Sequence, residues 1–311
     1  MRSQLLLLLG AAVLSAASNI TKEDQIAVPT IGDSMPVWSG RSLITIHNDR
    51  TETVAIRLFD YLGNESATFG FGLPGAPRIK IWSRAQGPGG AIALSGLAVA
   101  DDGRRSPFLA RLSPNGTILK VTATAPYCPF LIAFNSDGTI LSVGTEWGPD
   151  GKDDPAEDYH VLRRFDSAGI QIGSLFPFST LAARSELAGG YLVSGPDRVG
   201  WYTGAFGDSP TRYIEIKTSG EIVYYQGIPI ALPAKVDGVA ISKDGQVFAT
   251  KFLTSGSTLY TLDRSTGSWS VVDVPRTTGK PFSTLLGIDE DRLVMLERTN
   301  PPLITHYRVG Q

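Results

Sequence analysis

The stretch from 129 to 178 reads PFLIAFNSDG, TILSVGTEWGPDGKDDPAEDY, HVLRRFDSAG and IQIGSLFPF when it is divided at its polar turns. Each of the four segments contains a run rich in Ile, Leu, Val and Phe, which is typical of β-strands. The first and third segments end in a polar turn whose last residue is a glycine, Gly138 and Gly169. The stretch therefore predicts one unit of four antiparallel strands.

The same unit recurs along the chain at intervals of 47 to 55 residues, marked by two series of glycine turns. The predicted turns between first and second strands contain Gly40, Gly90, Gly138, Gly190 and Gly245, with Asp289 to Asp291 in the last unit. The predicted turns between third and fourth strands contain Gly63, Gly116, Gly169, Gly220 and Gly267. Short hairpins need positive φ angles, which glycine adopts without steric penalty. The recurrence predicts an all-β fold, a β-propeller of six four-stranded blades.

The last unit supplies only three predicted strands, and the missing outer strand has a candidate near the N-terminus, Gln25 to Ile31. A terminal strand that completes the last blade removes exposed sheet edges, which otherwise invite aggregation. Before it, residues 1–18 have one basic residue, an apolar core and small residues at a cleavage site, the pattern of a secretory signal peptide. Residues 19–311 are then expected to form a single propeller domain.

Composition narrows the class of partner and the compartment. The formal net charge of −2 lacks the basic surplus of a nucleic-acid-binding protein. No segment reaches the roughly 20 apolar residues of a transmembrane helix. The single cysteine, Cys128, allows no intrachain disulfide, so packing must stabilise the fold. We expect an exported monomer, periplasmic or extracellular, and the excess of arginine over lysine favours a bacterial source.

Several segments resemble blades of TolB-like and NHL-like six-bladed propellers, namely AFNSDGTILSVG, RRFDSAGIQIG, AISKDGQVFAT and LYTLDRSTGSW. The resemblance covers nearly the whole mature chain and implies an architecture. These are turn and strand motifs, so they imply no particular activity.

No complete catalytic motif is present. The segment from Gly70 to Gly75 satisfies G-x-G-x-x-G, but prolines follow it and no helix is predicted, so it is expected to be a loop between blades. His47, His160 and His306 fall in three different predicted blades. A Ser-His-Asp triad could form from them only through an unpredicted tertiary contact.

The long, irregular loops are expected on the face opposite the glycine turns, and such loops usually carry binding sites. Candidate ligand-binding residues on that face are Arg78, Lys80, Arg184, Glu186, Lys235 and Asp237, with Trp147 and Trp201 as apolar walls. The alternative for each is an ordinary solvated or satisfied side chain.

An acidic insert, EWGPDGKDDPAED from Glu146 to Asp158, extends one of these loops. Its carboxylates are ligands of the kind that Ca²⁺ binds, and the candidate ligands are Glu146, Asp150, Asp153 and Asp154. Their order is not that of an EF-hand loop. The alternative is a solvated acidic loop without a metal.

The leading interpretation is an exported propeller that binds a protein partner or a small ligand at its loop-rich face, with no identifiable catalysis. The alternative is a metal-dependent lactonase- or lyase-like hydrolase. The segment 236–240, VDGVA, resembles the Asp-Gly segment of six-bladed lactonases, which implies a metal-binding role for Asp237. The glutamate and asparagine of that family have no identifiable counterparts here. A third interpretation, implied by the TolB-like resemblance, is a component of an envelope complex.

Overall fold

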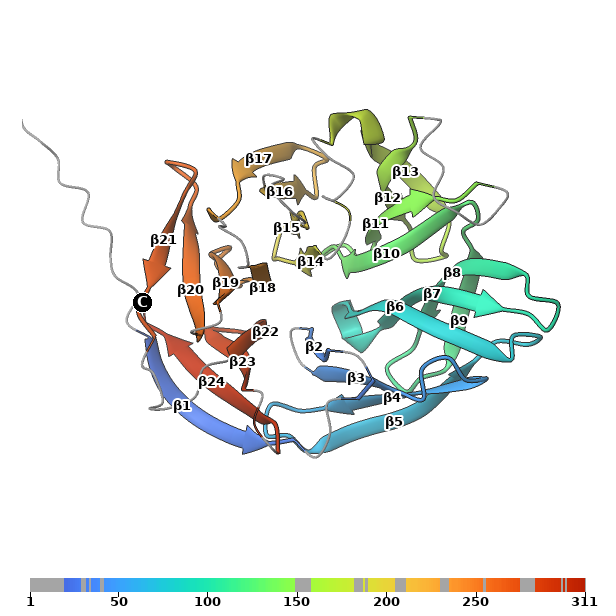
Figure 1. The fold of residues 1–311 in the computed structure, drawn as a ribbon, viewed down its shortest axis with the longest axis horizontal. Helices are drawn as coiled ribbons and strands as arrows, with labels where there is room; N and C mark the ends of the chain where they lie inside the picture. The colour runs from blue at the N-terminus through green and yellow to red at the C-terminus, as the bar shows by residue number, and fades with distance from the viewer. Residues whose placement is uncertain are drawn as a thin grey trace, which may run out of the picture.

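The computed structural model describes residues 20–28, 32–33, 35–39, 42–148, 158–181, 187, 190–204, 211–229, 235–253, 256–274, 283–297, 299 and 301–310. Within these ranges the strands form six antiparallel sheets of four strands each, arranged as blades around a common centre (Figure 1). The predicted six-bladed propeller is confirmed.

Five blades are built from consecutive strands, and the innermost strand comes first in each. Blade 1 contains β2 (Val37–Trp38), β3 (Leu43–His47), β4 (Thr53–Phe59) and β5 (Glu65–Gly72). Blade 2 contains β6 (Arg78–Gln86), β7 (Ile92–Val99), β8 (Arg105–Leu112) and β9 (Ile118–Ala123). Blade 3 contains β10 (Tyr127–Phe134), β11 (Ile140–Glu146), β12 (His160–Phe165) and β13 (Gln171–Pro177). Blade 4 contains β14 (Tyr191–Ser194), β15 (Arg198–Tyr202), β16 (Arg212–Lys217) and β17 (Ile222–Gln226). Blade 5 contains β18 (Lys235–Ile241), β19 (Val247–Leu253), β20 (Gly256–Asp263) and β21 (Ser268–Val272).

Blade 6 joins the two ends of the chain. It contains β22 (Ser283–Asp289), β23 (Arg292–Glu297) and β24 (Leu303–Val309), and β1 (Ile20–Ala27) pairs antiparallel with β24 as its outer strand. The predicted closure is confirmed, but the strand begins at Ile20 instead of Gln25, and residues 29–31 lie outside the described ranges. Within its polar run TKED, Glu23 forms ion pairs with Arg308 on the neighbouring strand β24 and with Arg292 on β23, and these pairs hold β1 against the blade.

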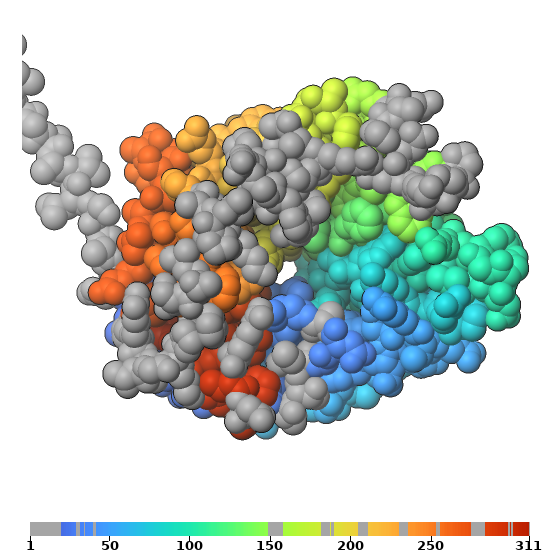
Figure 2. All heavy atoms as spheres, in the orientation of Figure 1, coloured from blue at the N-terminus to red at the C-terminus, as the bar shows by residue number. Residues whose placement is uncertain are grey.

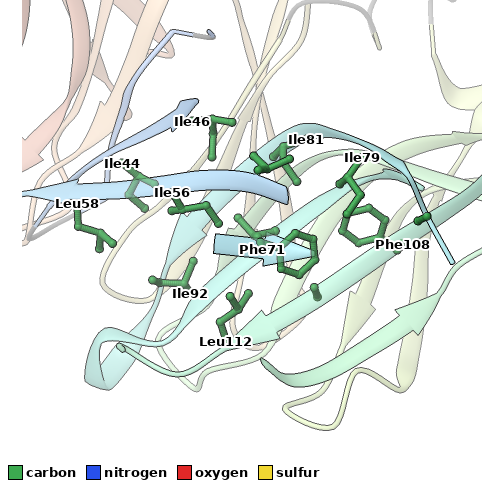
Figure 3. Close-up of a cluster of buried hydrophobic side chains, with 14 residues drawn as sticks. Ile44, Ile46, Ile56, Leu58, Phe71, Ile79, Ile81, Ile92, Phe108 and Leu112 are labelled. Atoms are coloured by element: carbon green, nitrogen blue, oxygen red, sulfur yellow. The ribbon is translucent and has the colours of Figure 1, made fainter. Parts of the chain in front are cut away.

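The hydrophobic core lies between neighbouring blades. In β4, the buried residues Val54, Ile56 and Leu58 alternate with more exposed ones, as expected for a strand with its two faces in different environments. They pack with residues of blade 2, including Ile92 and Phe108, in one continuous cluster (Figure 3). Each such apolar side chain contributes roughly 1.5–3 kcal/mol on burial. Packing between blades therefore holds the ring together.

The glycine turns between third and fourth strands are confirmed. Their φ angles range from 70° to 91° at Gly63, Gly116, Gly169, Gly220 and Gly267. In the other series Gly90, Gly138 and Gly245 also have positive φ, whereas Gly40 lies outside the described residues.

The prediction for Gly190 is wrong. This residue precedes β14, and the turn between β14 and β15 is formed by Gly195 to Asp197. A Cβ atom on Gly190 would lie 2.5 Å from the carbonyl oxygen of Tyr202. The glycine is therefore required for a close approach of two backbones and not for a hairpin turn.

Candidate ligand-binding site

The innermost strands of all six blades, β2, β6, β10, β14, β18 and β22, surround a central cavity of about 340 Å³. Figure 2 shows an opening at the centre of the ring, beside residues of blade 1. The lining is largely apolar, with Met35, Leu131 and Val193 among its residues, and Ser83 and Thr284 add hydroxyl groups. A cavity of this size lies at the lower end of the range for small-molecule sites, about 300–1,000 Å³.

The cavity begins at a set of β-bulges in the inner strands. The pairing register shifts between Ile81 and Ser83 in β6 and between Pro129 and Leu131 in β10, so Trp82 and Phe130 are the extra residues. Further register shifts occur around Asp237 and Gly238 in β18 and around Leu286 in β22. In β6 and β10, lining begins with the residue after the bulge, Ser83 and Leu131. Bulges re-aim side chains at sheet edges and next to sites. Those of β6, β10 and β18 lie at the loop-side end of the cavity, whereas lining residues of β22 lie on both sides of its bulge.

Two glycines on second strands make these bulges sterically allowed. A Cβ atom on Gly96 would lie 2.2 Å from the carbonyl oxygen of Lys80, and one on Gly144 would lie 2.1 Å from that of Cys128. These distances are too short for any real Cβ contact. Only glycine allows β7 and β11 to approach the bulged strands so closely.

Arg84 places a positive charge at the cavity wall. It is 5% exposed, and its Nη2 donates a hydrogen bond to the carbonyl oxygen of Met35, another lining residue. Burial lowers the pKa of Arg84 to about 10, and the nearby carboxylate of Asp49 partly offsets this effect. The guanidinium therefore stays protonated at neutral pH. Among the described residues that line the cavity, Arg84 is the only one with a formal charge.

Three partly exposed aromatic rings flank the loop-side end of the cavity. The ring centroid of Trp82 lies 5.0 Å from that of Phe130 and 5.8 Å from that of Trp147, both in edge-to-face geometry. The backbone N–H of Trp147 donates to the carbonyl oxygen of Pro126 at 2.9 Å, which anchors this ring next to β10. Aromatic clusters of this kind provide large apolar contact surfaces for a ligand.

The channel continues toward the face of the glycine turns. A second cavity of about 250 Å³ is lined by turn residues of blades 1 to 4 and shares Ser39, Gln86 and Ser194 with the first. Ser39 Oγ donates to the carbonyl oxygen of Gln86 at 3.0 Å and accepts from its backbone N–H at 2.7 Å. These bonds tie the inner strands of blades 1 and 2 together at this end.

The predicted candidates on blades 2 and 3 lie near the loop-side end of the channel. Arg78 is exposed at the start of β6, and Lys80 is half-buried two residues further along. Trp147 belongs to the aromatic cluster described above. The structure thus brings Trp147 close to β6, whereas Arg78 and Lys80 lie outside the cavity lining.

The remaining ligand-binding candidates are placed differently. The prediction of Trp201 as an apolar wall is wrong, because its side chain is fully buried in the core and packs edge-to-face on Phe176. Asp237 is buried at the bulge of β18, where it accepts a hydrogen bond from Thr284 Oγ1 at 2.7 Å. Arg184 and Glu186, together with the side chain of Lys235, lie outside the described residues.

The predicted calcium ligands are only partly described. Glu146 forms an ion pair with Arg163, whose guanidinium also lies 4.1 Å from the ring centroid of Tyr127. Asp150, Asp153 and Asp154 fall outside the described residues. In the described part of the chain, no three His, Cys, Asp or Glu side chains are grouped so as to hold a metal ion. Glu146 already has a cationic partner, and the calcium site stays a prediction.

The histidines occupy blades 1, 3 and 6, as expected. His47 Nε2 lies 3.0 Å from Thr45 Oγ1, and burial, followed by Arg57, lowers the pKa of His47. His306 is buried between the rings of Trp38 and Tyr61, and burial likewise lowers its pKa. Neither ring nitrogen of His306 has a hydrogen-bond partner among the described residues. Its surroundings are those of a core residue.

Sequence reasoning missed Arg84, the charged residue of the cavity lining, and Trp82, which contacts both other rings of the aromatic cluster. Both lie on β6, the strand that carries the predicted candidates Arg78 and Lys80. Arg84 stands between Ser83 and Ala85, so its immediate neighbours in the sequence gave no signal that it would be buried. The bulge that exposes Trp82 has no clear signature in the sequence.

The fold resembles those of solved structures at low sequence identity. No protein-family model matches the chain, and no curated protein sequence matches it. A protein of Bacteroides fragilis, named as an inferred exported protein, aligns with a TM-score of 0.57 and 13% identity over 95% of this chain and 97% of that one. The acylaminoacyl peptidase of Pyrococcus horikoshii aligns with a TM-score of 0.54 and 14% identity over 89% of this chain but only 44% of that one. Streptogramin B lyase aligns with a TM-score of 0.49 and 13% identity over 94% of this chain and 98% of that one.

At these identities the likenesses establish the fold alone. In the described residues, no helix has the length and apolar character needed to cross a membrane. The N-terminal strand β1 pairs with β24 and so supplies the fourth strand of blade 6. The chain is a six-bladed β-propeller, closed by its N-terminal strand.

Proposed function

We propose that this protein is an exported propeller that binds a small organic ligand in its central channel. The observation that carries the proposal is the cavity of about 340 Å³ walled by the inner strands of all six blades. The wall is mostly apolar with a few polar groups, the usual composition of a small-molecule site. The rigid strands of the blades hold these side chains in place before any ligand arrives.

The test compares ligand-induced stabilisation of the wild type with that of a variant whose channel is narrowed. Val193 on β14 lines the cavity and is partly exposed, so Val193→Phe should fill part of it. A ligand present at 100 times its Kd stabilises the folded state by about 2.7 kcal/mol. We expect compounds from a small-molecule library to raise the Tm of the wild type and to lose this effect in V193F.

The matched control is Val271→Phe, a substitution on the outer strand β21, where the valine is 64% exposed. V271F should respond to the same compounds as the wild type does. Ligands whose Tm shift survives V193F bind elsewhere, and that result would contradict the channel as the site.

Export is part of the same proposal. It is supported by the leader-like composition of residues 1–18, and a similarly folded Bacteroides protein carries a name that points to export. Expression of the full chain in a bacterium should yield protein in the periplasm or medium whose first residue lies near Asn19. Recovery of uncleaved chain from the cytoplasm alone would contradict this part of the proposal.

A further inference from the structure

We infer that the ligand of the central channel is an organic anion, a carboxylate attached to a flat apolar body, and that Arg84 binds its charged group. This inference rests on the proposed function and names the chemical class of the ligand. Two independent features carry it: the sign of the charge on the cavity wall and the aromatic rings at its loop-side end.

The charge on the wall is positive and lies in a poorly solvated place. Arg84 and its hydrogen-bond partner Met35 both line the cavity, and Arg84 is almost fully buried. The interaction between a cation and an incoming anion is several times stronger at such a site than in water, because less solvent screens it. A guanidinium also presents its N–H groups in a planar fork that matches the two oxygens of a carboxylate.

Asp49, whose charge acts on Arg84, is not part of the cavity wall. Asp49 lies outside the lining, where its Oδ1 accepts the backbone N–H of Ile81 at 2.9 Å. Asp237 accepts a hydrogen bond from the Thr284 hydroxyl, and it also lies outside the lining. The described residues that line the cavity include no carboxylate, so the charge that they present to an anion is that of Arg84.

The apolar body of the ligand has a matching surface. Trp82 comes two residues before Arg84 on β6, and together with Phe130 and Trp147 it forms the partly exposed aromatic cluster. Leu131 and Val193 continue the apolar surface into the cavity. A ligand whose carboxylate reaches Arg84 can thus place a ring or chain against these side chains.

The test uses three probes with one apolar body and different head groups: 4-phenylbutyrate, 4-phenylbutan-1-ol and 4-phenylbutylamine. Their Kd values are measured by calorimetry on the full mature chain. Hydrogen bonds to charged groups contribute enough that the carboxylate should bind at least about tenfold more tightly than the alcohol. The amine should bind most weakly.

Two substitutions should move this preference in opposite directions. Arg84→Met removes the charge, and the carboxylate and alcohol should then bind within about twofold of each other. Asp49→Asn removes the negative charge that opposes Arg84 while keeping an acceptor for Ile81, so the carboxylate should bind several-fold more tightly. Arg105→Met, an exposed residue on β8, changes the net charge equally and should leave all three Kd values unchanged.

The outcomes separate the two proposals. If none of the probes binds the wild type at millimolar concentration, the inferred ligand class is refuted, and the channel site is then decided by the library screen on the wild type and V193F. If all three bind with equal Kd values, the channel site stands and the anion preference is refuted. A preference that persists in R84M also refutes the role of Arg84. If R84M fails to fold, D49N still decides, because unchanged carboxylate affinity in that variant contradicts the inference.

Discussion

Removal of the Glu215 carboxylate should destabilise the contact between blades 4 and 5. Glu215 lies on β16, and its side chain is 0% exposed. It accepts a hydrogen bond from Arg198 Nη1 at 2.6 Å, and from Nε and Nη2 of Arg264 at 2.9 and 2.6 Å. Because Arg264 follows β20 in blade 5, the carboxylate joins two blades. We expect Glu215→Ala to lower the free energy of unfolding.

The size of the loss in unfolding free energy depends on the hydrogen bonds that each arginine retains in the variant. Removing one partner of a buried ion pair typically costs about 3–5 kcal/mol. Arg198 retains Asp197 at 2.7 and 2.8 Å, and Arg264 retains the carbonyl oxygen of Gly245. The loss should therefore be near the lower end, about 3 kcal/mol. With an unfolding entropy of about 2 cal/mol/K per residue, this corresponds to a decrease in Tm of about 5 °C.

The assay is urea and thermal unfolding followed by circular dichroism. The control is Glu221→Ala, because Glu221 is 57% exposed and pairs with Lys217 at 3.0 Å on the surface. An exposed pair of this kind contributes less than about 1 kcal/mol. If E215A and E221A lose equal unfolding free energy, burial does not make the Glu215 contact strong, and the reasoning is refuted. Glu215→Gln keeps the volume and one acceptor oxygen, and its loss should lie between that of E215A and zero.

Three further perturbations test the ring closure and the packing of its turns. Gly116→Ala should lower the free energy of unfolding more than Gly220→Ala does. Both glycines have positive φ, but only a Cβ atom at position 116 would contact the ring of Phe69, at 2.3 Å. Equal losses of unfolding free energy in urea would contradict this. Burial lowers the pKa of His306 below 6.5, so the unfolded chain binds its proton more readily, and stability should fall as the pH drops below about 6.5. His306→Phe should reduce that pH dependence, and an unchanged dependence would exclude His306 as its source. Glu23→Gln weakens two ion pairs between β1 and blade 6, and amide exchange in β1 should accelerate while exchange in β16 does not.

The sequence alone is sufficient for the architecture because the propeller repeats a local pattern. Each unit needs short apolar strands and tight turns, and the residues that allow positive φ in a turn act through their own backbone. Gly63, Gly169 and Gly267 could therefore be assigned before any contact was known. Gly190 could not, because its role depends on the approach of Tyr202 from the next strand.

The candidate site was predicted only in outline. The loop-rich face was expected to carry the ligand, and Trp147 does lie near the loop-side end of the channel. Trp201 was predicted as an apolar wall, but its side chain is buried in the core. The prediction failed because alternation along a strand does not tell which neighbouring blade a side chain contacts. Whether a side chain points toward the axis depends on twist and bulges, which arise from pairing between strands.

What the amino-acid sequence determined by itself is the repeating unit, the number of blades and the closure by an N-terminal strand, because these follow from hydrophobic alternation and turn chemistry within short segments. The tertiary structure alone decided the contents of the channel. Arg84 lies at the wall of a largely apolar cavity, and Trp82 protrudes from a bulge beside Phe130, only because six inner strands converge on one axis. The converging residues are far apart in the sequence, and no local pattern records their meeting.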